Sequence, residues 1–300
     1  MALPDFLVIG APDAGMEILL AGLRRCPAVF LPATDLGPPG DLGPPGDLGP
    51  PGDLGPGAAP GAGGPAGGGA GPWGLDAPRR RARFEALVDP APVGVLRGVS
   101  APYYLADFTA LRHLHELLPY VRLIALLRDP AARAHAHWLR MRAADLEPIA
   151  DFEGALAAEG GRACAGWPWP WRYLALGRYG DQVQRLYTLF ARHQVLLVPY
   201  PELSVDPAAA LGRVHRFLGL GRHRGPAGTG RADRCAAVPV PVQRCGDPGG
   251  LRCAEPAAVA AAARRLEPAM AARLRAGFHA DLALLDQVTG RRWALGPAPE

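Results

Sequence analysis

The sequence contains no lysine and no asparagine, and Ser100 and Ser204 are its only serines. All of its permanently charged basic side chains are therefore arginines. Without lysine the chain has no ε-amine for Schiff-base chemistry or for a phosphate contact, and without asparagine it has no N-glycosylation sequon. A nucleotide bias in the gene is the simplest explanation for this composition.

Apolar runs long enough to cross a bilayer, which need about 18 residues, are also missing. The chain enters an apolar segment directly after Asp5, so we expect neither a signal peptide nor a membrane anchor in it. Its 32 basic and 28 acidic residues give a net charge of +4. This near balance permits an anionic ligand but indicates no nucleic-acid partner.

Cysteines are few and odd in number, which argues against a fully paired disulfide framework. They are Cys26, Cys164, Cys235, Cys245 and Cys253. The glycines and the proline between Cys245 and Cys253 allow that loop to double back, so these two are the expected pair. Paired Cys-x-x-Cys sets are absent from the sequence, and we expect no metal site.

Low-complexity sequence fills a central stretch of the chain. Residues 35–55 repeat the unit Asp-Leu-Gly-Pro-Pro-Gly, and residues 56–72 consist only of glycine, alanine and proline. Such a stretch cannot bury a face against a hydrophobic core. We therefore predict a single domain formed by residues 1–32 and 73–296, interrupted by a disordered insert at residues 33–72.

Short apolar runs alternate with segments of helical periodicity over the rest of the chain. The expected strands are residues 6–9, 123–127 and 195–198, with an extended segment at 93–98. The expected helices are residues 18–25, 79–87, 108–118, 131–142, 152–158, 179–191 and 207–218. This order predicts an α/β fold with a central parallel sheet flanked by helices, and a ligand at the carboxyl ends of its strands.

Two of these strand ends carry candidate binding residues. The first strand runs into Gly10–Gly15, where backbone N–H groups and the following helix N-terminus can wrap a phosphate. Glycine in such a turn also satisfies turn geometry alone, so this feature is not decisive. The second strand end places the guanidinium of Arg128 before Asp129 and Pro130, which are favoured residues for a helix N-cap and first turn.

The run Arg128-Asp129-Pro130-x-x-Arg133, together with the strand-loop-helix that opens the chain, resembles the 3′-phosphate motif of PAPS-dependent sulfotransferases. The resemblance covers nearly the whole chain outside the insert. The Golgi glycosaminoglycan branch, which acts on heparan and chondroitin sulfate, is the most similar, and a bacterial homologue is the alternative. The Cys245–Cys253 segment resembles the cysteine loop of the heparan sulfate enzymes.

This resemblance implies a three-layer P-loop-like sulfotransferase fold and PAPS (3′-phosphoadenosine 5′-phosphosulfate) as co-substrate, without a metal. It further implies a carbohydrate acceptor of the glycosaminoglycan type and a location in the Golgi lumen. The implied nucleotide site consists of Gly10, Ala11, Pro12, Asp13, Ala14, Gly15, Met16, Glu17, Arg128, Ala136 and Arg252.

The first loop departs from the family pattern, in which a lysine is followed by Gly-Thr-Thr. Here the corresponding residues are Asp13, Gly15, Met16 and Glu17. Exchanging the cation for Asp13 changes the local charge by two units, and each unit at about 4 Å is worth on the order of 4 kcal/mol at an effective dielectric near 20. The sign of this change opposes the binding of an anion. Ala136 likewise replaces a phosphate-binding serine of the family.

No residue is assigned as the catalytic base. His135 and His137 have a suitable side chain, but they face different sides of one helical turn and packing or surface roles are favoured. Glu17 is explained equally by its place in a helix first turn. The run Trp167-Pro168-Trp169-Pro170-Trp171 could stack on sugar rings or pack on the core as a rigid loop.

Three functions are compatible with the fold. The first is sulfuryl transfer from PAPS to a carbohydrate hydroxyl. The second is a catalytically inactive sulfotransferase-like protein that acts as a binding module, which the missing lysine and hydroxyls suggest. The third is a kinase-like protein, which the absence of a Gly-Lys-Ser/Thr ending in the first loop argues against.

Overall fold

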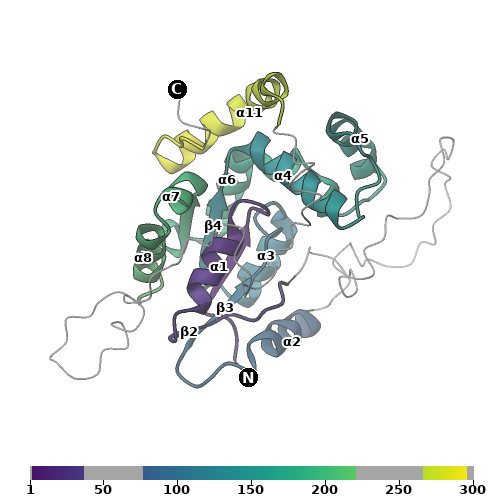
Figure 1. The fold of residues 1–300 in the computed structure, drawn as a ribbon. Helices are drawn as coiled ribbons and strands as arrows, with labels where there is room; N and C mark the ends of the chain where they lie inside the picture. Colours follow the sequence, from purple (N-terminus) through teal and green to yellow (C-terminus); the bar gives the residue numbers. More distant parts are fainter. Residues whose placement is uncertain (1, 37–76, 221–265, 296–300) are drawn as a thin grey trace, which may run out of the picture.

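Strands and helices alternate along the chain and build one parallel sheet (Figure 1). The computed structural model describes residues 2–36, 77–220 and 266–295. The strands are β1 (Phe6–Gly10), β2 (Val29–Phe30), β3 (Leu96–Ser100), β4 (Arg122–Leu127) and β5 (Val195–Pro199). Their order is β2-β3-β1-β4-β5, and every neighbouring pair is parallel. The predicted α/β class and parallel sheet are thus confirmed.

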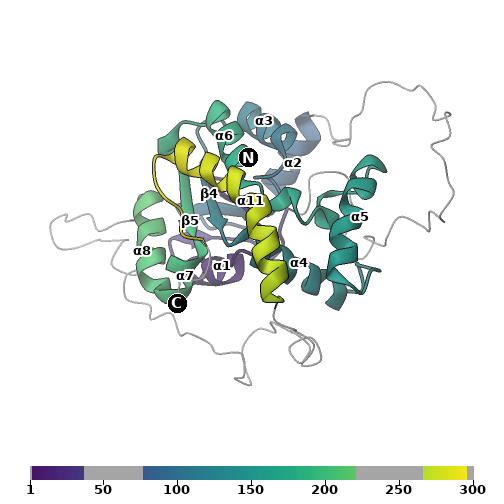
Figure 2. The same ribbon diagram turned by 90° about the horizontal axis from the view of Figure 1, so that it is seen from above.

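Helices cover both faces of this sheet (Figure 2). The helices are α1 (Met16–Arg24), α2 (Ala77–Val88), α3 (Phe108–Leu117), α4 (Pro130–Ala143), α5 (Phe152–Cys164), α6 (Tyr179–Leu189), α7 (Tyr200–Val205), α8 (Pro207–Phe217) and α11 (Pro268–Thr289). Helices α1 and α8 lie on one side, and α3 and α6 lie on the other. Helices α7 and α11 and the short strand β2 are additional to the elements predicted from the sequence.

The centre of the core is the pair β1 and β4. Phe6–Ile9 and Leu123–Leu127 are fully buried, because helices cover this part of the sheet on both faces. A strand covered in this way reads as a continuous apolar run rather than as an alternating one. This pattern explains why both strands could be predicted from the sequence.

Helix α11 packs against α6 and α4. Its Asp281 carboxylate accepts hydrogen bonds from the backbone N–H groups of Gly180 (2.8 Å) and Asp181 (3.1 Å) at the start of α6. A Cβ atom on Gly180 would lie 2.1 Å from the Asp281 carbonyl oxygen, so only glycine permits this approach of the two helices.

The predicted insert begins too early in the chain. Leu36 lies inside the range 33–72 but is buried, and its backbone N–H donates to the Ser100 carbonyl at 2.7 Å. The core therefore extends at least to Leu36, because the chain closes over the end of β3 there. Residues 37–72 lie outside the described residues, as do Cys245, Cys253 and Arg252, and the predictions made for them stay predictions.

Candidate active site

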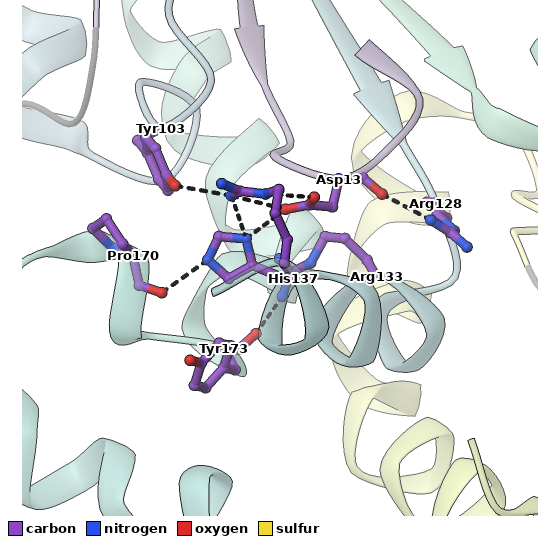
Figure 3. Close-up of polar contacts among 8 residues, drawn as sticks. Asp13, Tyr103, Arg128, Arg133, His137, Pro170 and Tyr173 are labelled. Atoms are coloured by element: carbon purple, nitrogen blue, oxygen red, sulfur yellow. Dashed lines mark hydrogen bonds and ion pairs between the residues drawn. The ribbon is translucent and has the colours of Figure 1, made fainter. Parts of the chain in front are cut away.

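The carboxyl ends of β1 and β4 meet as neighbours in the sheet and bring the two predicted halves of the site together. The Ala11 N–H donates to the Leu126 carbonyl at 2.8 Å. Arg128 Nη1 donates to the Asp13 carbonyl at 3.0 Å. The guanidinium of Arg128, which follows β4, thus contacts the backbone of the loop that follows β1 (Figure 3).

The loop Gly10–Gly15 leads directly into α1. Gly15 is the N-cap residue of α1, has a positive φ of 89° and has no side chain with which to cap the helix. The first N–H groups of α1 therefore lack a side-chain cap, which leaves them available to an anion. A Cβ atom on Gly15 would lie 2.7 Å from the ring of Tyr200, so this position requires glycine for space as well as for φ.

Arg128 lies half-buried between the loop and α7. Its guanidinium stacks over the ring of Tyr200 at 4.7 Å, a cation–π arrangement that limits its freedom. Asp129 caps α4 as predicted, because its carboxylate accepts from the Ala132 N–H at 2.7 Å. The same carboxylate pairs with Arg275 of α11 at 2.8 Å, which fixes the start of α4 next to Arg128.

Asp13 contacts two basic side chains of α4, those of His137 and Arg140 (Figure 3). Arg140 donates from Nε to Oδ1 at 2.8 Å and from Nη2 to Oδ2 at 3.1 Å. His137 Nδ1 lies 2.5 Å from Oδ2. Burial alone would raise the pKa of Asp13, but His137 and Arg140 hold this pKa well below its ordinary value. Asp13 is therefore a carboxylate paired with the permanent cation Arg140 and in contact with the His137 ring.

His137 is fully buried, and both of its ring nitrogens are engaged. Nε2 donates to the Pro170 carbonyl at 2.8 Å, while Nδ1 lies against Asp13 and 3.0 Å from Arg140 Nη2. Burial lowers the pKa of His137, and the Asp13 carboxylate opposes this shift. With no ring nitrogen left over, His137 joins the loop to the Trp167–Trp171 segment rather than serving as a free base.

Arg133 is a second buried cation behind the loop. Its side chain is fully buried and Nη2 donates to the Tyr173 carbonyl, whereas Nε and Nη1 lack a partner among the residues that the structure describes. Burial lowers the pKa of this guanidinium, and the negative charge of Asp13 acts in the opposite direction. Arg133 and Arg140 are thus two arginines that interact electrostatically with Asp13.

The prediction that Asp13 makes the loop repel anions did not include the partners of its carboxylate. Its carboxylate is paired with Arg140, and Arg133 contributes a further positive charge nearby. The sequence could not show this, because the partners of Asp13 lie more than a hundred positions away in α4. Arg140 is the site residue missed from the sequence; its place two turns after Arg133 on α4 was the available clue.

Among the other predicted nucleotide-site residues that the structure describes, only Glu17 has a polar side chain. Ala11, Pro12, Ala14 and Met16 are buried, and Ala136 is half-buried on α4. Glu17 is exposed on the first turn of α1, where a carboxylate favours the helix dipole. In these positions the ligand contacts available from the loop are backbone groups.

Aromatic packing accounts for the remaining candidates. His135 stacks on Trp138 with ring centroids 5.8 Å apart and meets Phe152 edge-on at 5.0 Å. Trp171 is buried and donates to the Leu146 carbonyl at 3.1 Å. Trp167 and Trp169 are only half-buried, with arginine guanidiniums 4.9 and 4.8 Å above their rings. The segment thus packs on the core and keeps two partly exposed indoles.

Over residues 2–36, 77–220 and 266–295, no group of three or more histidine, cysteine, aspartate or glutamate side chains is arranged to hold a metal ion. None of the helices in those ranges combines the length and apolar character that crossing a membrane requires.

Comparisons with known proteins match part of this chain, and its fold, to sulfotransferases. A family model described as the sulfotransferase domain matches residues 110–227, which include Arg128 and all of α4. Human bifunctional heparan sulfate N-deacetylase/N-sulfotransferase 2 is 31% identical over 124 residues, covering 40% of this chain and 14% of that protein. The mouse protein numbered 3 of the same name is 28% identical over 132 residues, or 41% and 14% of the two chains.

A solved sulfotransferase from Alicyclobacillus acidocaldarius has a TM-score of 0.67 and 20% identity, and the match covers 98% of both chains. This likeness confirms the predicted P-loop-like sulfotransferase fold. The matched segments cover only 14% of the two curated relatives. Both of these relatives are named as heparan sulfate enzymes. Residues 110–227 thus resemble the sulfotransferase domain, and the fold of the chain resembles that of a solved sulfotransferase.

Proposed function

We propose that this protein binds PAPS and transfers its sulfuryl group to a hydroxyl of a carbohydrate, with glycosaminoglycan as the acceptor class. The observation that carries the proposal is the contact between Arg128 and the loop backbone at Asp13. It brings a guanidinium and the uncapped N-terminus of α1 to one edge of the sheet. A ligand with two separate phosphate groups suits such a pair of anion sites.

The residues at this edge of the sheet fit the two phosphate groups of the nucleotide. Backbone N–H groups of the loop and of α1 would hold the 5′-phosphosulfate, and Arg128 would hold the 3′-phosphate. In the reaction the acceptor hydroxyl oxygen forms a bond to sulfur while the bond from sulfur to the 5′-phosphate oxygen breaks. The hydroxyl proton is released, and adenosine 3′,5′-bisphosphate leaves.

The carbohydrate acceptor is the less direct part of the proposal. The relatives, at 28–31% identity, are named for heparan sulfate. The half-buried indoles of Trp167 and Trp169 each have an arginine over one face, and their exposed parts could contact a sugar ring. His137 links this segment to the loop through the Pro170 carbonyl. A glycosaminoglycan acceptor would also carry with it the Golgi location expected from the family resemblance.

Calorimetric titration with adenosine 3′,5′-bisphosphate tests the nucleotide part. We expect binding that Arg128→Ala weakens by about tenfold to a hundredfold, because a charge-assisted hydrogen bond contributes about 1.5–3 kcal/mol. Arg185→Ala is the control, since Arg185 forms an exposed ion pair with Asp181 on α6. No binding by the wild-type protein at millimolar nucleotide would contradict the proposal.

Transfer of labelled sulfate from PAPS to heparan-type oligosaccharides tests the chemistry. We expect transfer that Arg128→Ala abolishes and Arg185→Ala leaves intact. Nucleotide binding without transfer to any carbohydrate offered would instead support the inactive binding module.

A further inference from the structure

Arg140 is an arginine whose position is set by Asp13 but whose charge still reaches solvent. Two of its nitrogens are held by the two carboxylate oxygens of Asp13, and Nη2 also lies 3.4 Å from the Tyr103 hydroxyl. Its side chain is nevertheless 46% exposed, against 9% for Asp13. Among the described residues, Nη1 alone of its guanidinium nitrogens makes no hydrogen bond.

Two guanidiniums therefore reach the same loop residue from different directions. Arg128 binds the Asp13 carbonyl, and Arg140 binds the Asp13 carboxylate. Figure 3 shows Arg128 on one side of Asp13 and His137 on the other. Because Arg128 is also committed to the ring of Tyr200, it cannot serve both ends of an extended anion.

Permanent positive charge lies close to the Asp13 carboxylate. Asp13 and the nearby Glu17 are acidic, while Arg133 and Arg140 contribute two permanent positive charges. The buried Arg133 also has two nitrogens without a partner among the described residues. An anion at the uncapped end of α1 would therefore be attracted by these two cations as well as by the helix N-terminus.

We propose that Arg140 contacts the 5′-phosphosulfate of the bound nucleotide through Nη1, its nitrogen without a hydrogen bond among the described residues, and that Asp13 is the residue that positions Arg140. This proposal rests on the proposed function and deepens it by naming the cation at the sulfuryl end of the site. Asp13 then positions Arg140, a cation of α4. The loop has no lysine of its own, and Arg140 supplies the positive charge in its place.

This arrangement makes an unusual prediction for Asp13. If Asp13 only repelled the nucleotide, then Asp13→Asn would tighten binding, because it removes a negative charge. If Asp13 positions Arg140, the same change leaves Arg140 free to swing into solvent, and binding weakens. The direction of the change in Kd therefore separates the two roles.

Calorimetry on the full chain with three nucleotides tests the assignment. We expect Arg140→Gln to weaken adenosine 3′,5′-bisphosphate by about tenfold or more and to leave adenosine 3′-monophosphate unchanged. Arg128→Ala should weaken both ligands, whereas adenosine 5′-phosphosulfate should respond to Arg140→Gln alone. Arg140→Lys should recover part of the loss, because it restores the charge without the two-point contact.

The control is Arg185→Ala, whose side chain is 52% exposed and also paired with an aspartate, and which should leave every Kd unchanged. Thermal unfolding of each variant shows whether it is folded at the titration temperature, and Asp13→Asn provides a second route if Arg140→Gln is unfolded. Wild-type binding with no effect of Arg140→Gln, or tighter binding by Asp13→Asn, overturns this assignment alone. Absence of wild-type binding overturns the proposed function with it.

Discussion

Two ion pairs of similar geometry, Asp13–Arg140 and Glu147–Arg162, differ in how much of their side chains is exposed. Arg140 binds Asp13 through two hydrogen bonds and keeps 46% of its side chain exposed. Arg162 binds Glu147 through two hydrogen bonds at 2.6 and 2.7 Å, with 7% and 0% of the two side chains exposed. The first pair faces the site, and the second lies inside the core.

The surroundings of Glu147 complete its hydrogen bonding. Its carboxylate also accepts from the Tyr173 hydroxyl at 2.6 Å and from the Ile149 N–H at 2.8 Å. Burial alone would raise the pKa of Glu147, yet Arg162 and Tyr173 hold this pKa below its ordinary value. A buried charge satisfied in this way maintains the shape of the core, whereas a charge with a free donor can bind a ligand.

The largest effect should come from breaking the buried pair. Arg162→Ala leaves the carboxylate of Glu147 buried without its cation, and we expect the free energy of unfolding to fall by about 3–5 kcal/mol. Urea denaturation measures this loss. The double variant Glu147→Leu with Arg162→Met should recover part of it, because it removes the unpaired charge but leaves the Tyr173 hydroxyl and the Ile149 N–H without their acceptor. A loss below 1 kcal/mol would mean that the pair behaves like a surface ion pair.

A smaller loss of unfolding free energy should follow from Asp13→Lys, the substitution that restores the lysine of the family pattern. Asp13→Lys places an ammonium between Arg140 and His137 and removes the carboxylate that holds both. We expect a loss of about 2–3 kcal/mol in unfolding free energy and no gain in nucleotide affinity. The exchange Asp13→Arg with Arg140→Asp keeps an opposite-charge pair and should be less destabilising. Tighter nucleotide binding by Asp13→Lys alone would show that the loop lacks a cation.

Gly15→Ala should be next in size. The residue has a positive φ, and a Cβ atom would meet the Tyr200 ring at 2.7 Å, so we expect about 1–2 kcal/mol of lost stability and weaker nucleotide binding. The matched control is Gly160→Ala in α5, where a Cβ meets nothing within 4 Å. That change should stabilise the protein by about 0.5–1 kcal/mol. Equal effects of the two substitutions in thermal unfolding would contradict the tight approach of Tyr200.

The fold follows from the sequence where local patterns are strong. The buried runs of β1 and β4 and the Asp129-Pro130 start of α4 could all be predicted, because each is specified by neighbouring residues. Helix α11 could not, since its apolar face is weakly marked and its anchors, Asp281 and Arg275, act on partners far away in sequence.

The site divides in the same way. The contact between Arg128 and the loop was predictable, because adjacent parallel strands end at the same sheet edge. The pairing of Asp13 with Arg140 was not, because residue types alone give Asp13 a charge but not its neighbours. A departure from a family motif therefore identifies the position that changed, and the three-dimensional contacts decide whether the chemistry changed with it.

Acidification should weaken the contribution of both ion pairs to the free energy of unfolding. This is the smallest of the expected effects. The pKa values of Asp13 and Glu147 are lower in the folded protein than in the unfolded chain. Each group therefore stabilises the fold above its ordinary pKa, and this contribution disappears as the pH falls through the acid range. We expect Asp13→Asn and Glu147→Gln each to flatten the decline of unfolding free energy between about pH 5 and pH 2, by on the order of 1 kcal/mol.

Salt should separate the two variants within this measurement. The Asp13 pair is partly exposed, so about 0.5 M sodium chloride should screen it and reduce the acid dependence that Asp13→Asn removes. The Glu147 pair is enclosed, so the dependence that Glu147→Gln removes should persist at the same salt concentration. Buried charges are screened far less than exposed ones. Equal salt sensitivity of the Asp13 and Glu147 pairs would therefore contradict the difference in exposure between them. That difference is the basis for assigning the Asp13 pair to ligand binding and the Glu147 pair to core packing.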